Sequence, residues 1–301
     1  MRKSILGLMG LLFYISRFSQ PIVKLYRTKR GAVLQFEDTF RFLSGEDDWD
    51  TLVNRDDLRS YLLGASGENQ PSEEASVAVS EELLAPIDSQ EVWAAGVTYY
   101  SSRLARMEES RDAGGGDFYS RVYEADRPEL FMKATPARVV DPGQPFRIRQ
   151  DSEWDVPEPE LTVFATASGR IAAYTIGNDV SSRSIEGENP LYLPQAKTYD
   201  DCACLGPCLY VPENPLFEET KVRLQIRRED ETAFKGETTL AQMKRSPEEL
   251  VGYLFRETSF PSGVFLMTGT GIVPSQDFTL RSGDEVSILI EGIGTLVNTV
   301  A

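Results

Sequence analysis

The feature that most constrains this chain is the stretch 153–209, in which three acidic residues and a lysine lie among short apolar runs. Glu158 and Glu160 stand two residues apart ahead of alternating apolar residues, so a strand here carries both carboxylates on one face. Asp179 ends the next apolar run. Residues 168–169, Ser-Gly, fit a two-residue turn between the runs, because glycine accepts a positive φ. The pattern predicts a β-hairpin.

A two-residue loop at 168–169 fixes the strand pairing and places Glu158 opposite Asp179, with Glu160 on the same face. Directly opposed residues have Cβ atoms roughly 5 Å apart. Three carboxylates this close repel one another, and a hard divalent cation such as Mg²⁺ relieves that repulsion. A solvated acidic hairpin face is the alternative. Because Lys197 follows nearby, we favour a metal site for Mg²⁺, which Mn²⁺ could replace.

The net charge argues against some classes of binding partner, and the cysteine content indicates the cellular compartment. The 301 residues carry a formal net charge of −16, whereas nucleic acids and anionic membranes require a basic surface on their partners. The three cysteines all lie within 202–208, and the chain has no histidine to complete a metal site with them. An odd, clustered set is not a disulfide framework, so we expect buried thiols in the reducing cytoplasm.

The chain divides into three parts by composition. Residues 1–20 form an appended hydrophobic segment whose apolar run is too short to span a bilayer and lacks a small-x-small cleavage site. Residues 21–85 predict a small N-terminal α/β domain: a hairpin turning at Gly31, a helix at 50–63 and an acidic linker at 64–80. Residues 86–301 are then the catalytic domain.

Five segments in a fixed order resemble the fumarylacetoacetate hydrolase family: PEPELTVF, YTIGNDVSSR, QAKTYDDCACLGP, LMTGTGIVP and LRSGDEVSILIEGIGTLVN. The resemblance covers roughly residues 92–301. It implies an α+β fold with a mostly β catalytic domain of mixed, rolled sheets. It also implies a divalent metal on Glu158, Glu160 and Asp179, and a homo-oligomer, either dimer or tetramer.

Within the family, RPELFMKATPARVV, SEWDVPEPEL and ENPLYLPQAK are most similar to dehydratases of 2-keto-3-deoxy sugar acids. This implies a metal-dependent lyase that converts 2-keto-3-deoxy-D-arabinonate to 2,5-dioxopentanoate in pentose oxidation. Hydrolytic relatives carry a histidine where this chain has Ser102 and Ala105, so the usual hydrolytic base is missing. An acylpyruvate hydrolase, an oxaloacetate decarboxylase and a catalytically silent binding protein remain as alternatives.

The resemblance also implies where the 2-keto acid binds. The segments that match the family's substrate contacts are 102–103, 192–195 and 268–270, and the residues are Ser102, Arg103, Tyr192, Gln195, Thr268, Gly269 and Thr270. Taken alone, Arg103 also fits a solvated helix charge, and 268–270 fits a plain turn between strands.

Dehydration needs a base at C3 and an acid at the departing hydroxyl, and we assign these roles to Glu129 and Lys197. Glu129 shares one strand face with Phe131 and Lys133. Desolvation raises the pKa of a carboxylate, and a nearby cation lowers the pKa of a lysine, so both groups can serve near neutral pH. Which of the two takes the C3 proton stays open.

Overall fold

The structure is a computed structural model that describes residues 21–109 and 116–301. The hydrophobic segment predicted at 1–20 lies outside the described residues. None of the described helices has the length and apolar character needed to cross a bilayer.

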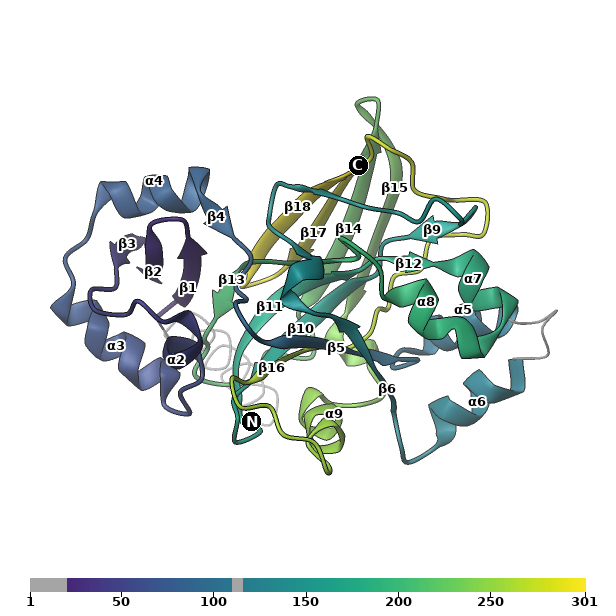
Figure 1. Ribbon diagram of the computed structural model, residues 1–301, viewed down its shortest axis with the longest axis horizontal. Helices are drawn as coiled ribbons and strands as arrows, with labels where there is room; N and C mark the ends of the chain where they lie inside the picture. Colours follow the sequence, from purple (N-terminus) through teal and green to yellow (C-terminus); the bar gives the residue numbers. More distant parts are fainter. Residues whose placement is uncertain (1–20, 110–115) are drawn as a thin grey trace, which may run out of the picture.

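The N-terminal elements form a lobe to one side of the molecule, on the left in Figure 1. The hairpin predicted around Gly31 is present, with Gly31 at a φ of 117° where β2 begins. The elements of this lobe are β1 (Val23–Thr28), β2 (Gly31–Phe36), β3 (Thr39–Phe42), α2 (Trp49–Val53), α3 (Leu58–Glu68), α4 (Glu73–Glu81) and β4 (Leu83–Leu84).

The linker predicted at 64–80 is wrong. Helix α3 continues through its first residues, and α4 occupies most of the rest. Ser72 caps α4 by accepting a hydrogen bond from the backbone N–H of Ala75, and both Ala75 and Ala78 are fully buried. Small side chains, which suggested flexible chain, here allow α4 to pack closely on the lobe. The helix predicted at 50–63 is also two helices, because α2 ends at Val53.

An eleven-stranded sheet runs through both parts of the chain in the order β3-β2-β1-β13-β11-β10-β16-β5-β6, with β4 and β7 attached to β1 and β13. Most neighbours are antiparallel, but β16–β5 and β13–β7 are parallel. The remaining strands of this sheet are β5 (Glu91–Gly96), β6 (Glu129–Ala134), β7 (Val139–Val140), β10 (Pro159–Ala165), β11 (Ile171–Asp179), β13 (Ala203–Tyr210) and β16 (Val264–Met267).

The large sheet is rolled. Strand β6 ends the strand order, yet Lys133 on β6 reaches Asp179 at the end of β11, and the chain that follows β6 pairs as β7 with β13. This curvature turns one face of the sheet inward around the ends of β10 and β11. The mixed, rolled sheet and the α+β class therefore match the prediction.

A second sheet packs against the large one in the order β15-β14-β17-β18-β8. Leu161 and Val163 of β10 join its apolar side chains, such as Leu224, in one buried cluster. The intervening residues of β10 point to the other face, where Glu158 and Glu160 lie. The strands are β8 (Pro145–Phe146), β14 (Lys221–Arg228), β15 (Glu231–Thr239), β17 (Glu285–Ile290) and β18 (Gly294–Val300).

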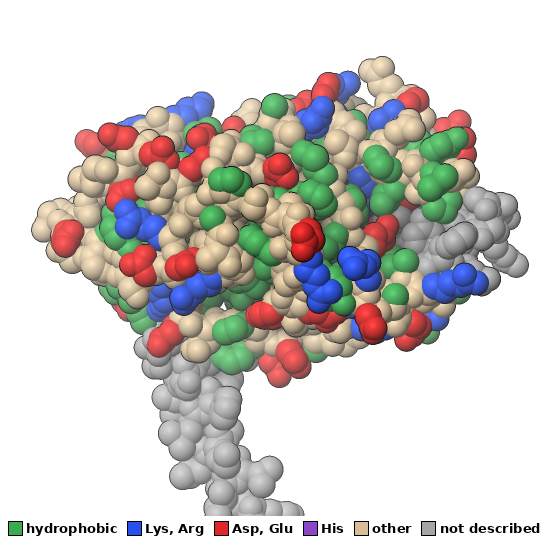
Figure 2. Space-filling model, turned by 60° about the horizontal axis from the view of Figure 1, so that its bottom comes forward, with side chains coloured by type: hydrophobic (Ala, Val, Ile, Leu, Met, Phe, Trp, Pro, Cys, Tyr) green, Lys and Arg blue, Asp and Glu red, His purple; other side chains and the backbone are tan. Residues whose placement is uncertain are grey.

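Short helices gather beside the ends of the strands, with α5, α7 and α8 clustered on the right in Figure 1. The remaining elements are α5 (Tyr100–Glu109), α6 (Gly116–Glu124), η1 (Pro136–Arg138), β9 (Asp155–Val156), β12 (Ser181–Ser182), α7 (Arg183–Glu188), η2 (Pro190–Tyr192), α8 (Leu193–Lys197), η3 (Leu240–Gln242) and α9 (Pro247–Leu254). The three cysteines are buried and free, as predicted. On the face shown in Figure 2, acidic and basic side chains are interspersed.

Candidate metal centre and active site

Strands β10 and β11 bring the predicted acidic residues together. Their connection is one residue longer than the predicted two-residue turn, because Thr166 N donates to Arg170 O at 2.9 Å. A bulge beside Phe164 then absorbs the extra residue. Beyond the bulge Pro159 pairs with Asn178, and Asp179 N donates to Glu158 O at 3.0 Å, which is the predicted pairing.

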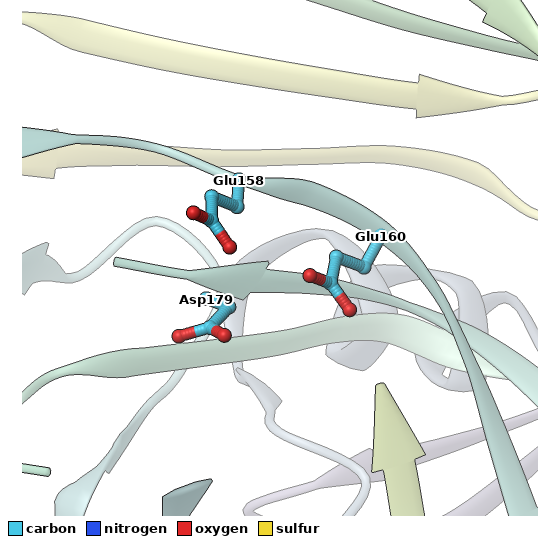
Figure 3. A group of neighbouring side chains, drawn as sticks. All are labelled: Glu158, Glu160 and Asp179. Carbon is cyan, nitrogen blue, oxygen red and sulfur yellow. The ribbon is translucent and has the colours of Figure 1, made fainter. Parts of the chain in front are cut away.

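The carboxylates of Glu158, Glu160 and Asp179 converge on one point (Figure 3), and one oxygen of each lies within 4.8 Å of the others. All three side chains are buried. Burial raises the pKa of Glu160 well above its ordinary value, and the charges of Asp179 and Glu158 raise it further. Three hard oxygen donors in a buried cluster of like charge match the ligand preference of Mg²⁺.

Lys197, the last residue of α8, lies directly against two of these carboxylates. Its Nζ is 2.7 Å from Glu158 Oε2, 3.0 Å from Asp179 Oδ2 and 2.6 Å from Ser181 Oγ. The side chain is 1% exposed. The predicted lysine therefore lies at the acidic cluster, where its charge offsets part of the repulsion among the acids.

Arg183 is a further buried cation at the site, and no role for it was predicted from the sequence. Its Nη2 is 2.6 Å from Glu158 Oε1, and its Nη1 is 3.4 Å from Glu186 Oε2. All three side chains are buried. Glu158 is therefore held from both sides, by Arg183 on one oxygen and by Lys197 on the other. The available signal was the position of Arg183 four residues after Asp179, inside the motif YTIGNDVSSR.

The segment 268–270 holds one of the three clustered carboxylates in place. Gly269 N donates to Glu160 Oε2 at 2.6 Å, and Gly269 adopts a φ of 95°. A Cβ atom at Gly269 would lie 1.9 Å from Thr98 Oγ1, so glycine is required for this approach. The flanking hydroxyls bond to backbone, Thr268 Oγ1 donating to Leu161 O and Thr270 Oγ1 to Ile272 O.

The other predicted substrate contacts lie on α5, η2 and α8. Ser102 Oγ donates to Tyr99 O at 2.8 Å, within the start of α5. Arg103 Nη2 donates to Ser120 Oγ at 3.0 Å, which ties α5 to α6. Tyr192 and Gln195 are exposed, and the Gln195 carbonyl accepts from Arg149 Nη1 at 3.0 Å. Substrate binding by these four residues stays a prediction.

Strand β6 carries Glu129, Phe131 and Lys133 on one face, as predicted. Glu129 pairs across the sheet with Gly96, and its side chain lies over that glycine. The Phe131 ring centroid is 5.7 Å from Lys197 Nζ. Lys133 Nζ is 2.7 Å from Asp179 Oδ1, so two of the three side chains contact Lys197 or a carboxylate of the acidic cluster directly.

A cavity of about 450 Å³ adjoins the segment 268–270. Its lining includes Ser101, Trp154, Phe234, Glu237, Gly271 and Ile272. Trp154 O also accepts a 2.7 Å hydrogen bond from Arg183 N, which places this wall beside the charged cluster. The volume lies within the range of about 300–1,000 Å³ typical of small-molecule sites.

A rolled mixed sheet with buried carboxylates, a buried lysine and an adjoining cavity defines a metal-dependent enzyme for a small molecule. The model of the family "Fumarylacetoacetate (FAA) hydrolase C-terminal" matches residues 106–301. The chain belongs to the fumarylacetoacetate hydrolase family.

Two curated relatives in this family are dehydratases. The chain is 52% identical to a probable 2-keto-3-deoxyxylonate dehydratase of Haloferax volcanii over 225 residues, covering 74% of this chain and 76% of that protein. It is 43% identical to the 2-dehydro-3-deoxy-D-arabinonate dehydratase of Saccharolobus solfataricus over 222 residues, covering 72% and 74%. Among solved structures, it matches a 2-keto-3-deoxy-D-arabinonate dehydratase complexed with magnesium and 2,5-dioxopentanoate with a TM-score of 0.77 and 33% identity. That match covers 93% of this chain and 98% of the other.

Proposed function

We propose that this chain is a magnesium-dependent hydro-lyase that converts 2-keto-3-deoxy-D-arabinonate to 2,5-dioxopentanoate and water. The observation that carries the proposal is the buried cluster of Glu158, Glu160 and Asp179 with Lys197 at its edge, in a chain similar to two dehydratases. The chain has no histidine, so the base used by hydrolytic relatives is absent.

The names of the two relatives describe the same chemistry. In the D series, xylonate and arabinonate differ only at carbons 2 and 3. Carbon 2 is a ketone and carbon 3 a methylene in the 2-keto-3-deoxy acid, so both differences disappear. A single substrate with one stereocentre at carbon 4 therefore satisfies both names.

Glu158, Glu160 and Asp179 would hold Mg²⁺, which would supply Lewis-acid polarisation of the substrate's 2-keto group and so make the C3 protons acidic. Glu129 and Lys197 carry the proton transfers: one removes a C3 proton, and the other donates a proton to the C4 hydroxyl as it leaves as water. The unsaturated 2-keto acid that remains tautomerises through C5 to 2,5-dioxopentanoate. Arg183 keeps Glu158 oriented while Lys197 acts.

Pocket residues orient the substrate. Gly269 fixes Glu160, and Gly271, which follows the segment 268–270 directly, lines the cavity. In this proposal five further residues contact the substrate: Ser102, Arg103, Tyr192, Gln195 and Thr270. The side chains of Ser102, Arg103 and Thr270 must first rearrange, because they are hydrogen-bonded within the protein. The side chains of Tyr192 and Gln195 are exposed.

The protein acts in the cytoplasm as a homo-oligomer, either a dimer or a tetramer. Its buried free cysteines suit a reducing compartment. Leu191 on η2 is 83% exposed, and the neighbouring Tyr192 is 37% exposed, which supports contact with a second copy. Light scattering on the purified protein measures the oligomeric state.

The test of function is a panel of 2-keto-3-deoxy sugar acids, acylpyruvates and oxaloacetate incubated with purified protein and Mg²⁺, with products identified by mass. The proposal expects loss of one water from 2-keto-3-deoxy-D-arabinonate as the fastest reaction. Faster cleavage of a carbon–carbon bond in an acylpyruvate, or faster decarboxylation of oxaloacetate, would replace dehydration as the function.

A further inference from the structure

Lys133 is a buried cation that the proposed mechanism does not use. Its side chain is 0% exposed on β6. Its Nζ is 2.7 Å from Asp179 Oδ1 and donates to Val180 O at 2.8 Å and to Lys197 O. The Tyr199 ring centroid lies 5.7 Å from the same nitrogen. Lys133 therefore donates hydrogen bonds to two backbone carbonyls and forms an ion pair with Asp179, so its ammonium contacts three different residues.

The partners of Lys133 belong to two elements that must be held together at the site. Asp179 and Val180 lie at the end of β11, and Lys197 is the last residue of the short helix α8. Carbonyls in the last turn of a helix have no partner within the helix. Lys133 supplies that partner for Lys197 while it also holds the metal ligand Asp179.

The contacts close a ring. Lys133 Nζ bridges Asp179 Oδ1 and the Lys197 carbonyl, and Lys197 Nζ bonds back to Asp179 Oδ2 at 3.0 Å. A second contact reinforces the ring, since Thr198 Oγ1 donates to Met132 O at 3.1 Å, one residue from Lys133. The ring fixes both the backbone and the ammonium of Lys197 against one carboxylate.

We propose that Lys133 is a positioning residue that holds Lys197 in register with the metal ligand Asp179. The inference rests on the proposed role of Lys197 in proton transfer. Lys133 touches neither substrate nor reacting atoms in this assignment. A displacement of about 1 Å at a reacting group can lower the rate about 10²-fold, so Lys133→Met should lower kcat about 10- to 100-fold with little change in KM.

A double-mutant cycle separates positioning from general destabilisation. We would measure kcat, KM and thermal unfolding for Lys133→Met, Lys197→Met and the double variant, with Lys133→Gln as a second, polar replacement in case the methionine variant folds poorly. Mn²⁺ binding reports whether the carboxylate cluster is intact, and it is measured from the electron paramagnetic resonance signal of free Mn²⁺. Arg41→Met is the matched control, because Arg41 is a buried cation of the N-terminal lobe that donates to Ser66 O and Thr39 Oγ1.

If Lys133 acts through Lys197, the double variant has a kcat within about threefold of Lys197→Met alone, and each variant still binds Mn²⁺. Arg41→Met lowers the unfolding temperature and keeps kcat. The positioning role is overturned if the fold-decrease in kcat of the double variant equals the product of the two single fold-decreases. It is also overturned if both Lys133 variants lose Mn²⁺ binding. Near-native kcat in Lys197→Met overturns the proposed role of Lys197 itself, a result that the single variant shows without reference to Lys133.

Discussion

The carboxylate of Glu129 occupies the space that a side chain on Gly96 would fill, since a Cβ atom there would lie 2.0 Å from Glu129 Oε2. The two residues pair across β5 and β6. A glycine on the neighbouring strand thus allows the proposed proton-transfer residue to lie flat against the sheet.

Gly96→Ala should therefore displace Glu129 and lower kcat about 10- to 100-fold, because proton transfer depends on close geometry. Mn²⁺ affinity should change little. Gly252→Ala on α9 is the matched control, because a Cβ atom there meets nothing within 4 Å. Steady-state kinetics of both variants check the prediction, and unchanged kcat in Gly96→Ala would remove Glu129 from the mechanism.

Glu129→Gln and Lys197→Met should each lower kcat by about 10² to 10⁴, the usual contribution of general acid–base catalysis. Deuterium incorporation at C3 from heavy water assigns the roles. A variant that exchanges C3 protons without dehydration has lost the acid, and one that does neither has lost the base. If both variants keep near-native kcat, the pair is structural.

Metal removal tests the acidic cluster. Excess EDTA should abolish turnover, and Mg²⁺ or Mn²⁺ should restore it, because the substrate's 2-keto group would lose its polarisation. Glu160→Gln should lower Mn²⁺ affinity at least tenfold while the protein stays folded, whereas Glu153→Gln, which changes an exposed acid seven residues away, should leave affinity unchanged. Full activity in EDTA contradicts the metal assignment.

Asp155 gives the fold a pH dependence separate from catalysis. Burial raises the pKa of this carboxyl from 3.8 to about 6. The folded state therefore favours the protonated acid, and the resulting stabilisation is present below about pH 4 and lost as pH rises through 6.

Asp155→Asn should remove this loss. At about 1.4 kcal/mol per pKa unit, this shift corresponds to about 3 kcal/mol, and part of it is already lost at pH 4. The free energy of unfolding of the variant, minus that of the natural protein, should therefore be about 2 kcal/mol larger at pH 8 than at pH 4. Urea unfolding at the two pH values measures the difference. An equal difference at both pH values would show that Asp155 titrates normally in the folded protein.

The sequence predicted the pairing of Glu158 with Asp179 because strand alternation and hairpin counting are local rules. The predicted loop was one residue too short, and the bulge beside Phe164 shifts the register back by one residue, so the pairing further along the hairpin is the predicted one. A bulge is set by packing on both faces of the sheet, so the alternation of apolar residues does not reveal it.

The contacts of Lys133 and Arg183 were beyond local rules. Lys133 meets Asp179 only because the large sheet rolls until β6 approaches the end of β11, and no pattern within β6 predicts that approach. Arg183 begins the six-residue helix α7, and neither strand alternation nor hairpin counting extends past Asp179 to that helix. The prediction of a linker where α4 lies was wrong for another reason, since alanine and serine suit both a close-packed helix and a flexible linker.

The pairing of β1 with β13, which joins Leu25 to Leu209, has a consequence for how the chain behaves when shortened. Without residues 21–85, the C-terminal half of β13 would present unpaired N–H and C=O groups, and the buried Leu205 and Leu209 would lose their apolar cover. An open, hydrophobic strand edge recruits strands from other chains. The N-terminal lobe therefore protects the catalytic part from edge-to-edge aggregation, and truncated protein should be recovered as aggregate.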